Sequence, residues 1–159
     1  MSGMDFAQLP LTLQSEVKPE YVDALDHMNV MWYTHLFDQA TWNFYDSFGF
    51  GREYHRGPFG SFALEIYHRH LAELRLGDSL RIYSRAVGRR DKLVHIMHFM
   101  LRERDGELSA TGEMLGIHVA LSSRRSAPMP EETAAAWDAI IADHRQLDWP
   151  AEPSGKISI

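Results

Sequence analysis

Four residues with reactive or hydrogen-bonding side chains stand close together in one polar segment: Asp23, Asp26, His27 and Asn29. A helical pattern begins directly after them, at Val30. The first turn of a helix leaves about four backbone N–H groups without partners inside the helix and carries roughly half a positive charge. Such a helix start can hold a developing oxyanion, and a neighbouring carboxylate can activate water or attack an acyl carbon. The segment therefore meets the chemical requirements of acyl transfer.

The same residues also have plainer structural interpretations. Asn29 or Asp26 could cap the helix, because both residue types are common at N-caps. His27 could be a turn residue bonded to the backbone, and Asp23 could be a solvated loop carboxylate. On spacing alone these structural roles are favoured, since helix caps are far commoner than active sites.

The elements that would position this segment follow from hydrophobic periodicity. Residues 12–18 alternate in part and predict a first strand, whereas residues 21–29 predict a loop. From Val30 to Phe48 apolar residues recur at helical spacing, and large aromatic side chains also lie off that stripe. This pattern is typical of a helix that is buried on several sides. Gly49 and Gly51 are expected to end it.

The rest of the chain predicts strands in hairpins and then a short helix. Alternating residues predict strands around 62–67, 80–85, 94–99 and 109–121, with turns at 88–91 and at Asp105-Gly106. Pro130 opens a helix that ends near His144. This order predicts an α+β fold in which an antiparallel β-sheet wraps around the long central helix. We expect a single domain over residues 1–159, with a core over about 10–145 and a loose tail over about 146–159.

Composition excludes several classes of protein. The chain has a formal net charge of −6 and no cysteine, so it has no disulfide, no thiol nucleophile and no thiolate metal ligand. An acidic chain gains little from the phosphate field of a nucleic acid. No apolar run approaches the roughly 18 residues that cross a bilayer, and no secretory leader begins the chain. We therefore expect a cytoplasmic protein that binds neither nucleic acid nor membrane.

Other catalytic chemistries find little support. The histidine pairs His68/His70 and His95/His98 have spacings that metal sites use, but no third ligand accompanies them, so no metal is expected. Neither a phosphate-cradling glycine loop nor a Gly-x-Ser-x-Gly elbow is present, which argues against nucleotide and serine hydrolases. Two small basic clusters suit one anionic ligand better than a polymer. They consist of Arg89, Arg90 and Lys92, and of Arg124 and Arg125.

The spacing of Asp23, His27, Asn29 and Tyr33 resembles the signature of the 4-hydroxybenzoyl-CoA thioesterase branch of the hotdog superfamily. The likeness extends over roughly residues 10–135 at the level of element order. It includes the strand with Glu65 and Tyr67, the turn at Leu76-Gly77-Asp78, and Arg124-Arg125 shortly before Pro128 and Pro130. Two positions depart from the family pattern. Asp26 stands where the family commonly has glycine, and Val30 stands where it commonly has a second asparagine.

This resemblance implies a hotdog fold and an enzyme that hydrolyses a small acyl-CoA to the free acid and coenzyme A. Asp23 would be the catalytic carboxylate, which either activates water or forms a transient anhydride. His27 and Asn29 would orient the reactants, and a backbone N–H near Asn29 or Val30 would donate to the thioester oxygen. No cofactor is implied apart from the coenzyme A of the substrate. The site would lie between two subunits of a homodimer or tetramer.

The resemblance also implies substrate-binding residues outside the reacting group. Asp26 could share or replace the role of Asp23, and Tyr33 belongs to the signature. Glu65 and His68 lie on the strand expected to face the helix, although an exposed strand face or a core position is the simpler interpretation. Arginines could bind the phosphates of coenzyme A, since guanidinium groups grip phosphate in bidentate fashion. The candidates are Arg89, Arg90, Arg124 and Arg125, with Lys92 beside them.

The stretch from Asp26 to Met31 is also similar to thioesterases of carnitine breakdown that act on betainyl-CoA. Trp32, Trp42, Tyr45 and Asp26 could hold such a cationic acyl group, although core packing is the favoured interpretation of these aromatics. Two other classes remain open. One is a hotdog acyl-thioester hydratase or dehydratase, and the other is a non-catalytic protein that binds acyl-CoA or an acyl carrier.

Overall fold

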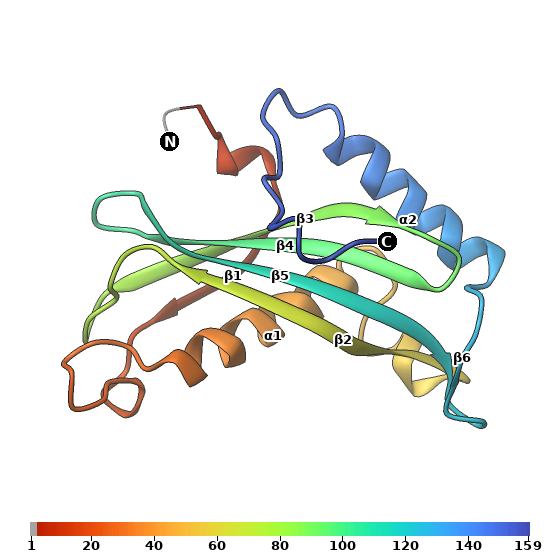
Figure 1. Cartoon of the computed structure of the whole chain (residues 1–159), viewed down its shortest axis with the longest axis horizontal. Helices are drawn as coiled ribbons and strands as arrows, with labels where there is room; N and C mark the ends of the chain where they lie inside the picture. Colours follow the sequence, from red (N-terminus) through yellow and green to blue (C-terminus); the bar gives the residue numbers. More distant parts are fainter. Residues whose placement is uncertain (1–2) are drawn as a thin grey trace.

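The computed structural model describes residues 3–159 and contains one antiparallel sheet with a long helix across one of its faces (Figure 1). The strands run in the order β1-β3-β4-β5-β2, and the short β6 pairs with β5. This arrangement confirms the predicted α+β class with an antiparallel sheet. The strands are β1 (Leu11–Glu16), β2 (Phe59–His70), β3 (Ser79–Arg89), β4 (Leu93–Arg102), β5 (Glu107–Ala120) and β6 (Arg125–Ser126).

Two α-helices and three short 3₁₀ turns complete the chain. Helix α1 spans Val30–Asp46 and α2 spans Glu131–His144, and the turns are Phe6–Gln8, Pro19–Tyr21 and Tyr54–Arg56. Helix α1 ends two residues before the predicted Phe48, because Gly49 with φ 83° lets the chain turn away. The strand β6 lies in a segment for which the sequence predicted none. It forms because Arg125 and Ser126 pair with the end of β5.

The sheet buries apolar residues on both of its faces because successive side chains of a strand point to opposite sides. On β4, Val94, Ile96 and Met100 belong to the two core clusters that contain α1 residues. Met97 and Phe99 belong to a third cluster. The long helix therefore covers one face, and other segments cover the opposite face.

The segment after α2 is packed rather than loose, which corrects the prediction of a free tail. Trp149 is buried against Phe6 and Phe99, with ring centroids 5.4 and 5.6 Å away. Arg85 on β3 donates to the carbonyl oxygens of Trp149 at 2.8 Å and His144 at 2.9 Å. The tail thus covers the sheet face that α1 leaves open. Burial of its large apolar groups offsets the loss of chain freedom.

Two further properties concern membrane-spanning helices and groups of metal ligands. No helix within residues 3–159 is long and apolar enough to span a membrane. Over the same range, no three His, Asp or Glu side chains are grouped so that they could hold a metal ion.

The closest approach of α1 to the sheet generates a testable prediction at Gly112 on β5. A Cβ atom there would lie 2.9 Å from Cδ2 of the buried Phe37 of α1. We expect Gly112→Ala to lower the free energy of unfolding by about 1–3 kcal/mol, because overpacking must displace the helix or the ring. Denaturant unfolding measures this loss.

A Phe37→Leu background provides the control, because it removes the ring that the new methyl group would strike. In that background Gly112→Ala should cost much less. An equal cost in both backgrounds would show that the contact with Phe37 is not the cause.

Candidate active site

The polar segment before α1 is organised by the side chains of Asp23 and Asn29. The Asn29 Nδ2 group donates to Asp23 Oδ2 at 2.8 Å, and the Leu25 N–H donates to Asp23 Oδ1 at 2.8 Å. Asn29 is also the N-cap of α1, because its Oδ1 accepts the Met31 N–H at 3.0 Å. The capping role considered for Asn29 is therefore real, and the same side chain also holds the carboxylate beside the helix start.

These contacts stabilise the ionised form of Asp23. The hydrogen bond from Asn29, then that from Leu25, and then the nearby His27 hold the pKa of the Asp23 carboxyl below its usual range. The side chain is partly exposed at the start of α1. Asp23 is therefore ionised at neutral pH, as a general base or a nucleophile must be.

The two backbone N–H groups considered as donors to a thioester oxygen differ in whether they already have a partner. The Asn29 N–H donates to the Tyr21 carbonyl oxygen at 2.8 Å, so it is already engaged. The Val30 N–H is the first of the helix and has no acceptor within the helix. Of the two donors considered for a thioester oxygen, Val30 is the one that the geometry favours.

Asp26 occupies the turn of the loop between Asp23 and His27. Its φ is 62°, in the left-handed region that favours glycine and that Asp adopts more readily than most residues. Its side chain is exposed, and its N–H donates to the Asp23 carbonyl oxygen at 3.1 Å. This conformation explains how Asp26 stands at a position where the family commonly has glycine.

His27 and Tyr33 line one cavity at the start of α1. His27 Nδ1 donates to the Met28 carbonyl oxygen at 3.2 Å, which directs Nε2 away from that bond. The cavity measures about 370 Å³ and does not have Asp23 in its wall. Its lining residues are His27, Met28, Val30, Tyr33, His70, Leu71, Ala72 and Glu73.

A second cavity of about 500 Å³ lies between α1 and the sheet, beside β2. His68 lines it, and burial lowers the pKa of that imidazole. Glu65 is exposed and lines neither cavity. Residues three apart on a strand point to opposite faces, so Glu65 does not face the helix with His68, and the exposed strand face that was the simpler interpretation describes Glu65.

The candidate phosphate-binding residues lie far from Asp23 within one chain. The end of β1 pairs with the start of β3, through Glu16 and Ser79. Arg89 is at the other end of β3, about 33 Å away at the usual rise of a strand. Figure 1 likewise shows β6 at the opposite end of the sheet from the segment before α1.

The contacts of these arginines also differ from those expected of side chains that are free to bind an anion. Arg89 binds Asp138 of α2 through two hydrogen bonds of 2.7 and 2.6 Å, so its guanidinium group is already paired. Arg124 lies over the Phe62 ring, 4.9 Å from its centroid, and Arg90 and Arg125 are exposed. A role for them at the site of the same chain is not supported, and a role at a partner's site requires a second copy.

The aromatic residues considered for a cationic group do not gather in one place. Trp32 stacks on Tyr21 with ring centroids 4.1 Å apart, near the start of α1. Trp42 and Tyr45 lie about 15–20 Å further along the helix. Core packing therefore describes Trp32 and Tyr45, and these residues do not form a cage with Asp26.

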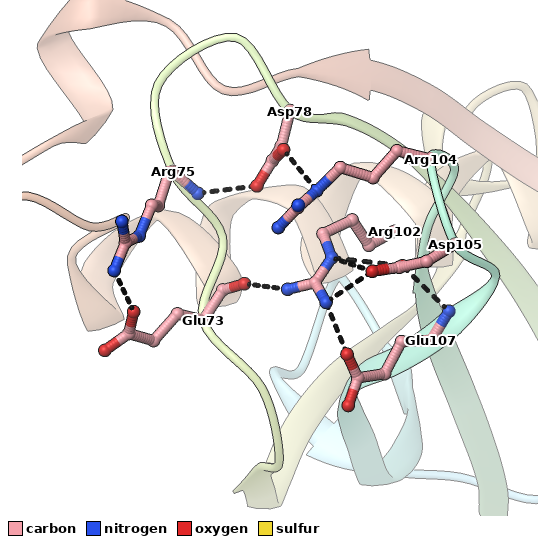
Figure 2. Close-up of polar contacts among 7 residues, drawn as sticks. All are labelled: Glu73, Arg75, Asp78, Arg102, Arg104, Asp105 and Glu107. Atoms are coloured by element: carbon pink, nitrogen blue, oxygen red, sulfur yellow. Dashed lines mark hydrogen bonds and ion pairs between the residues drawn. The ribbon is translucent and has the colours of Figure 1, made fainter.

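Sequence patterns did not point to Arg102, which supports the loop before α1 from outside (Figure 2). Its Nη1 donates to the Glu73 carbonyl oxygen at 2.6 Å, and its other donors bind Asp105 and Glu107. The next carbonyl, that of Leu74, accepts the Met28 N–H at 2.7 Å. Arg102 thus fixes the β2–β3 connection that in turn holds the loop before α1.

The comparisons with known proteins agree with this geometry. Residues 17–137 match the model of a family described as the thioesterase-like superfamily. A betainyl-CoA thioesterase of Pseudomonas aeruginosa is 30% identical over 146 residues, which cover 91% of each chain. An L-carnitine dehydrogenase/betainyl-CoA thioesterase of Agrobacterium fabrum is 32% identical over 142 residues, or 89% of this chain. The matched region is only 29% of the length of that longer relative.

Solved structures show the same fold. A Staphylococcus aureus protein in complex with coenzyme A superposes with a TM-score of 0.82 at 25% identity, over 95% of this chain and 96% of that one. A 1,4-dihydroxy-2-naphthoyl-CoA thioesterase from Synechocystis has a TM-score of 0.70 at 17% identity, over 88% and 98% of the two chains.

The contact between Asp23 and Asn29 predicts a measurable titration. In the wild type, the Asp23 carboxyl carbon should titrate below the ordinary aspartate midpoint of about 3.9. Asn29→Ala should raise that midpoint, because it removes the largest cause of the lowered pKa. NMR titration of the side-chain carboxyl measures both values. Equal midpoints in the two proteins would contradict the contact.

Because Arg102 holds the β2–β3 connection, its replacement is expected to loosen the backbone at Met28, which Arg102 does not itself bind. Arg102→Gln should lower stability by about 2 kcal/mol, because charged hydrogen bonds are lost and their partners are left unpaired. It should also speed hydrogen exchange at the Met28 amide, which bonds to Leu74. Arg81→Gln is the matched control, because Arg81 pairs with Glu103 at 2.6 Å and does not contact the β2–β3 connection. Equal exchange at Met28 in both variants would rule out the proposed support.

Proposed function

Because the chain belongs to the thioesterase-like superfamily, we propose that it hydrolyses a small acyl-CoA to the free acid and coenzyme A, with Asp23 as the catalytic carboxylate. One observation carries the assignment of Asp23. The side chain that caps α1, Asn29, also binds the Asp23 carboxylate and keeps it ionised at the helix start. A base and an oxyanion site then stand side by side.

The proposed reaction uses the helix start to stabilise charge. The thioester oxygen accepts the Val30 N–H, where the helix dipole favours the negative charge of a tetrahedral intermediate. Asp23 removes a proton from water while the water oxygen bonds to the acyl carbon. The carbon–sulfur bond then breaks, and the proton passes to the leaving thiolate. Direct attack by Asp23 would give an anhydride that water opens to the same products.

The side chains around this centre have proposed supporting roles. His27 and Tyr33 line the cavity at the helix start and would position the thioester or the water. His68 lines the cavity beside β2 and would contact the acyl group. The names of the Pseudomonas and Agrobacterium relatives make betainyl-CoA a substrate to test first.

A second copy of the chain would complete the site. Strand β2 is an edge strand, and it exposes Phe62, Leu64, Ile66 and Tyr67. An edge strand with exposed apolar groups is suited to pair with an identical strand. We therefore propose a homodimer at least, in which arginines of one subunit could reach coenzyme A bound to the other.

Thiol release from a panel of acyl-CoAs, betainyl-CoA included, tests the proposal. We expect Asp23→Asn and Asp23→Ala to lower kcat by at least about 100-fold, the usual contribution of a general base. Glu20→Gln is the control, because Glu20 is an exposed carboxylate close to the same loop.

Each other outcome points to a different conclusion. Loss of well under tenfold in both Asp23 variants would remove Asp23 from the mechanism. Binding of acyl-CoA without thiol release would indicate a non-catalytic binding protein. A change in the absorbance of an enoyl-CoA without thiol release would indicate a hydratase.

A further inference from the structure

The cavity beside β2 is a long apolar space that continues into a smaller one. Its wall contains apolar side chains from α1, β2 and β5, among them Phe37, Ile66 and Met114. A second space of about 60 Å³ shares Asp38, Thr41, Ala63 and Met114 with it. The shared residues make the two spaces neighbours along α1.

The charged side chains that line this combined cavity are acidic, although Arg124 lies over the Phe62 ring at the smaller space. Among the described residues that line either part, there is no Lys or Arg. Asp38 lines both parts, and no cationic side chain within residues 3–159 forms an ion pair with it. Glu113 also appears in the wall, but its carboxylate accepts from His95 at 2.7 Å and from the Ser154 N–H at 2.8 Å. Asp38, whose side chain is exposed to solvent, is therefore the carboxylate of the wall that has no ion-pair partner among the described residues.

Two of the imidazoles in the wall, those of His68 and His98, do not supply a counter-charge. Burial lowers the pKa of His68, and it lowers the pKa of His98 to about 3. Both nitrogens of His98 are engaged, by Thr41 at 2.9 Å and by Ser84 at 2.7 Å. His35 bonds to Gln39 at 2.7 Å. His68 and His98 are thus neutral at pH 7, and neither offsets the charge of Asp38.

The smaller space also contains an unpaired hydroxyl group. The Tyr45 hydroxyl is buried at the smaller space and has no hydrogen-bond partner among the described residues. Its oxygen therefore has unused lone pairs close to Asp38, whose charge helps to raise the pKa of Tyr45. Arg52 lies over Trp42 at 5.9 Å, but it pairs with Asp46 and so does not neutralise Asp38.

We propose that Asp38 selects acyl-CoA substrates whose acyl group is positively charged, over neutral acyl groups of the same shape. The inference rests on the proposed thioesterase function and adds its specificity-determining residue. A cation in an apolar cavity requires an opposite charge and gains from aromatic walls. Asp38 supplies the charge, and Phe37 supplies an aromatic wall beside it.

The position of Asp38 also predicts how far the cation should lie from the thioester. Asp38 is about 12 Å along α1 from Val30, at roughly 1.5 Å per residue. That span exceeds the reach of a two-carbon betainyl group. The selectivity should therefore increase when the ammonium group stands further from the carbonyl.

Two matched substrate pairs test this inference. Betainyl-CoA is compared with 3,3-dimethylbutyryl-CoA, and 4-(trimethylammonio)butyryl-CoA with 5,5-dimethylhexanoyl-CoA. Within each pair, carbon replaces the charged nitrogen and the shape is kept. We expect the wild type to prefer the cationic member in kcat/KM, by about tenfold or more for the longer pair and by less for the shorter pair.

Asp38→Asn should remove this preference. Turnover of the cationic substrates should fall by about tenfold, whereas kcat/KM for the neutral substrates should stay within about threefold. Glu16→Gln on β1 should keep the wild-type ratio, because that exposed carboxylate is outside both cavities.

The outcomes separate the inference from the function on which it rests. A wild type that cleaves none of the four substrates, and no other acyl-CoA of the panel, would overturn the proposed function. A wild type that cleaves them without regard to charge would overturn only the role of Asp38. The same holds if Asp38→Asn keeps the wild-type preference. The wild-type comparison alone decides the matter if the variant does not fold.

Discussion

The hydrogen bond between Asn29 and Asp23 is the interaction on which the proposed site depends. The asparagine side chain has one acceptor and one donor group, and the structure uses both. The acceptor caps α1 through the Met31 N–H, and the donor holds the carboxylate. One side chain therefore positions both the start of α1 and the Asp23 carboxylate, so neither can shift without the other. The bond also stabilises the ionised form of Asp23, since a donor to that form lowers the pKa.

The close packing of α1 on the centre of the sheet leaves a cavity at the edge of the sheet. At Gly112 the helix approaches β5 so closely that Phe37 covers the strand. Strand β2 lies at the edge, and the helix leaves a cavity beside it. The floor of that cavity contains His98, whose two hydroxyl partners keep a buried imidazole satisfied without a charge. Apolar walls and a single unpaired carboxylate, Asp38, are the result.

Periodicity predicted the main elements well, because local spacing determines them. The helix from Val30 and the hairpin at Asp105-Gly106 both appear where the pattern placed them. The tail was predicted wrongly, since a short polar segment with one tryptophan resembles a free end. Trp149 is buried by Phe6, Phe99 and Arg85, which come from distant parts of the chain. Glu65 and His68 lie on opposite faces of β2, because an offset of three residues reverses the face of a strand.

The chain's residue order was enough to locate the segment from Asp23 to Asn29 and the helix after it, because those contacts join residues at most six positions apart. The contacts between residues on different strands could be known only from the three-dimensional structure. Folding brought Arg102 to the connection that holds Met28, and it set Asp38 in an apolar cavity. It also separated Arg89 from the loop before α1 by the length of a strand. Such placements depend on which strands pair and in what register, and no local pattern records that choice.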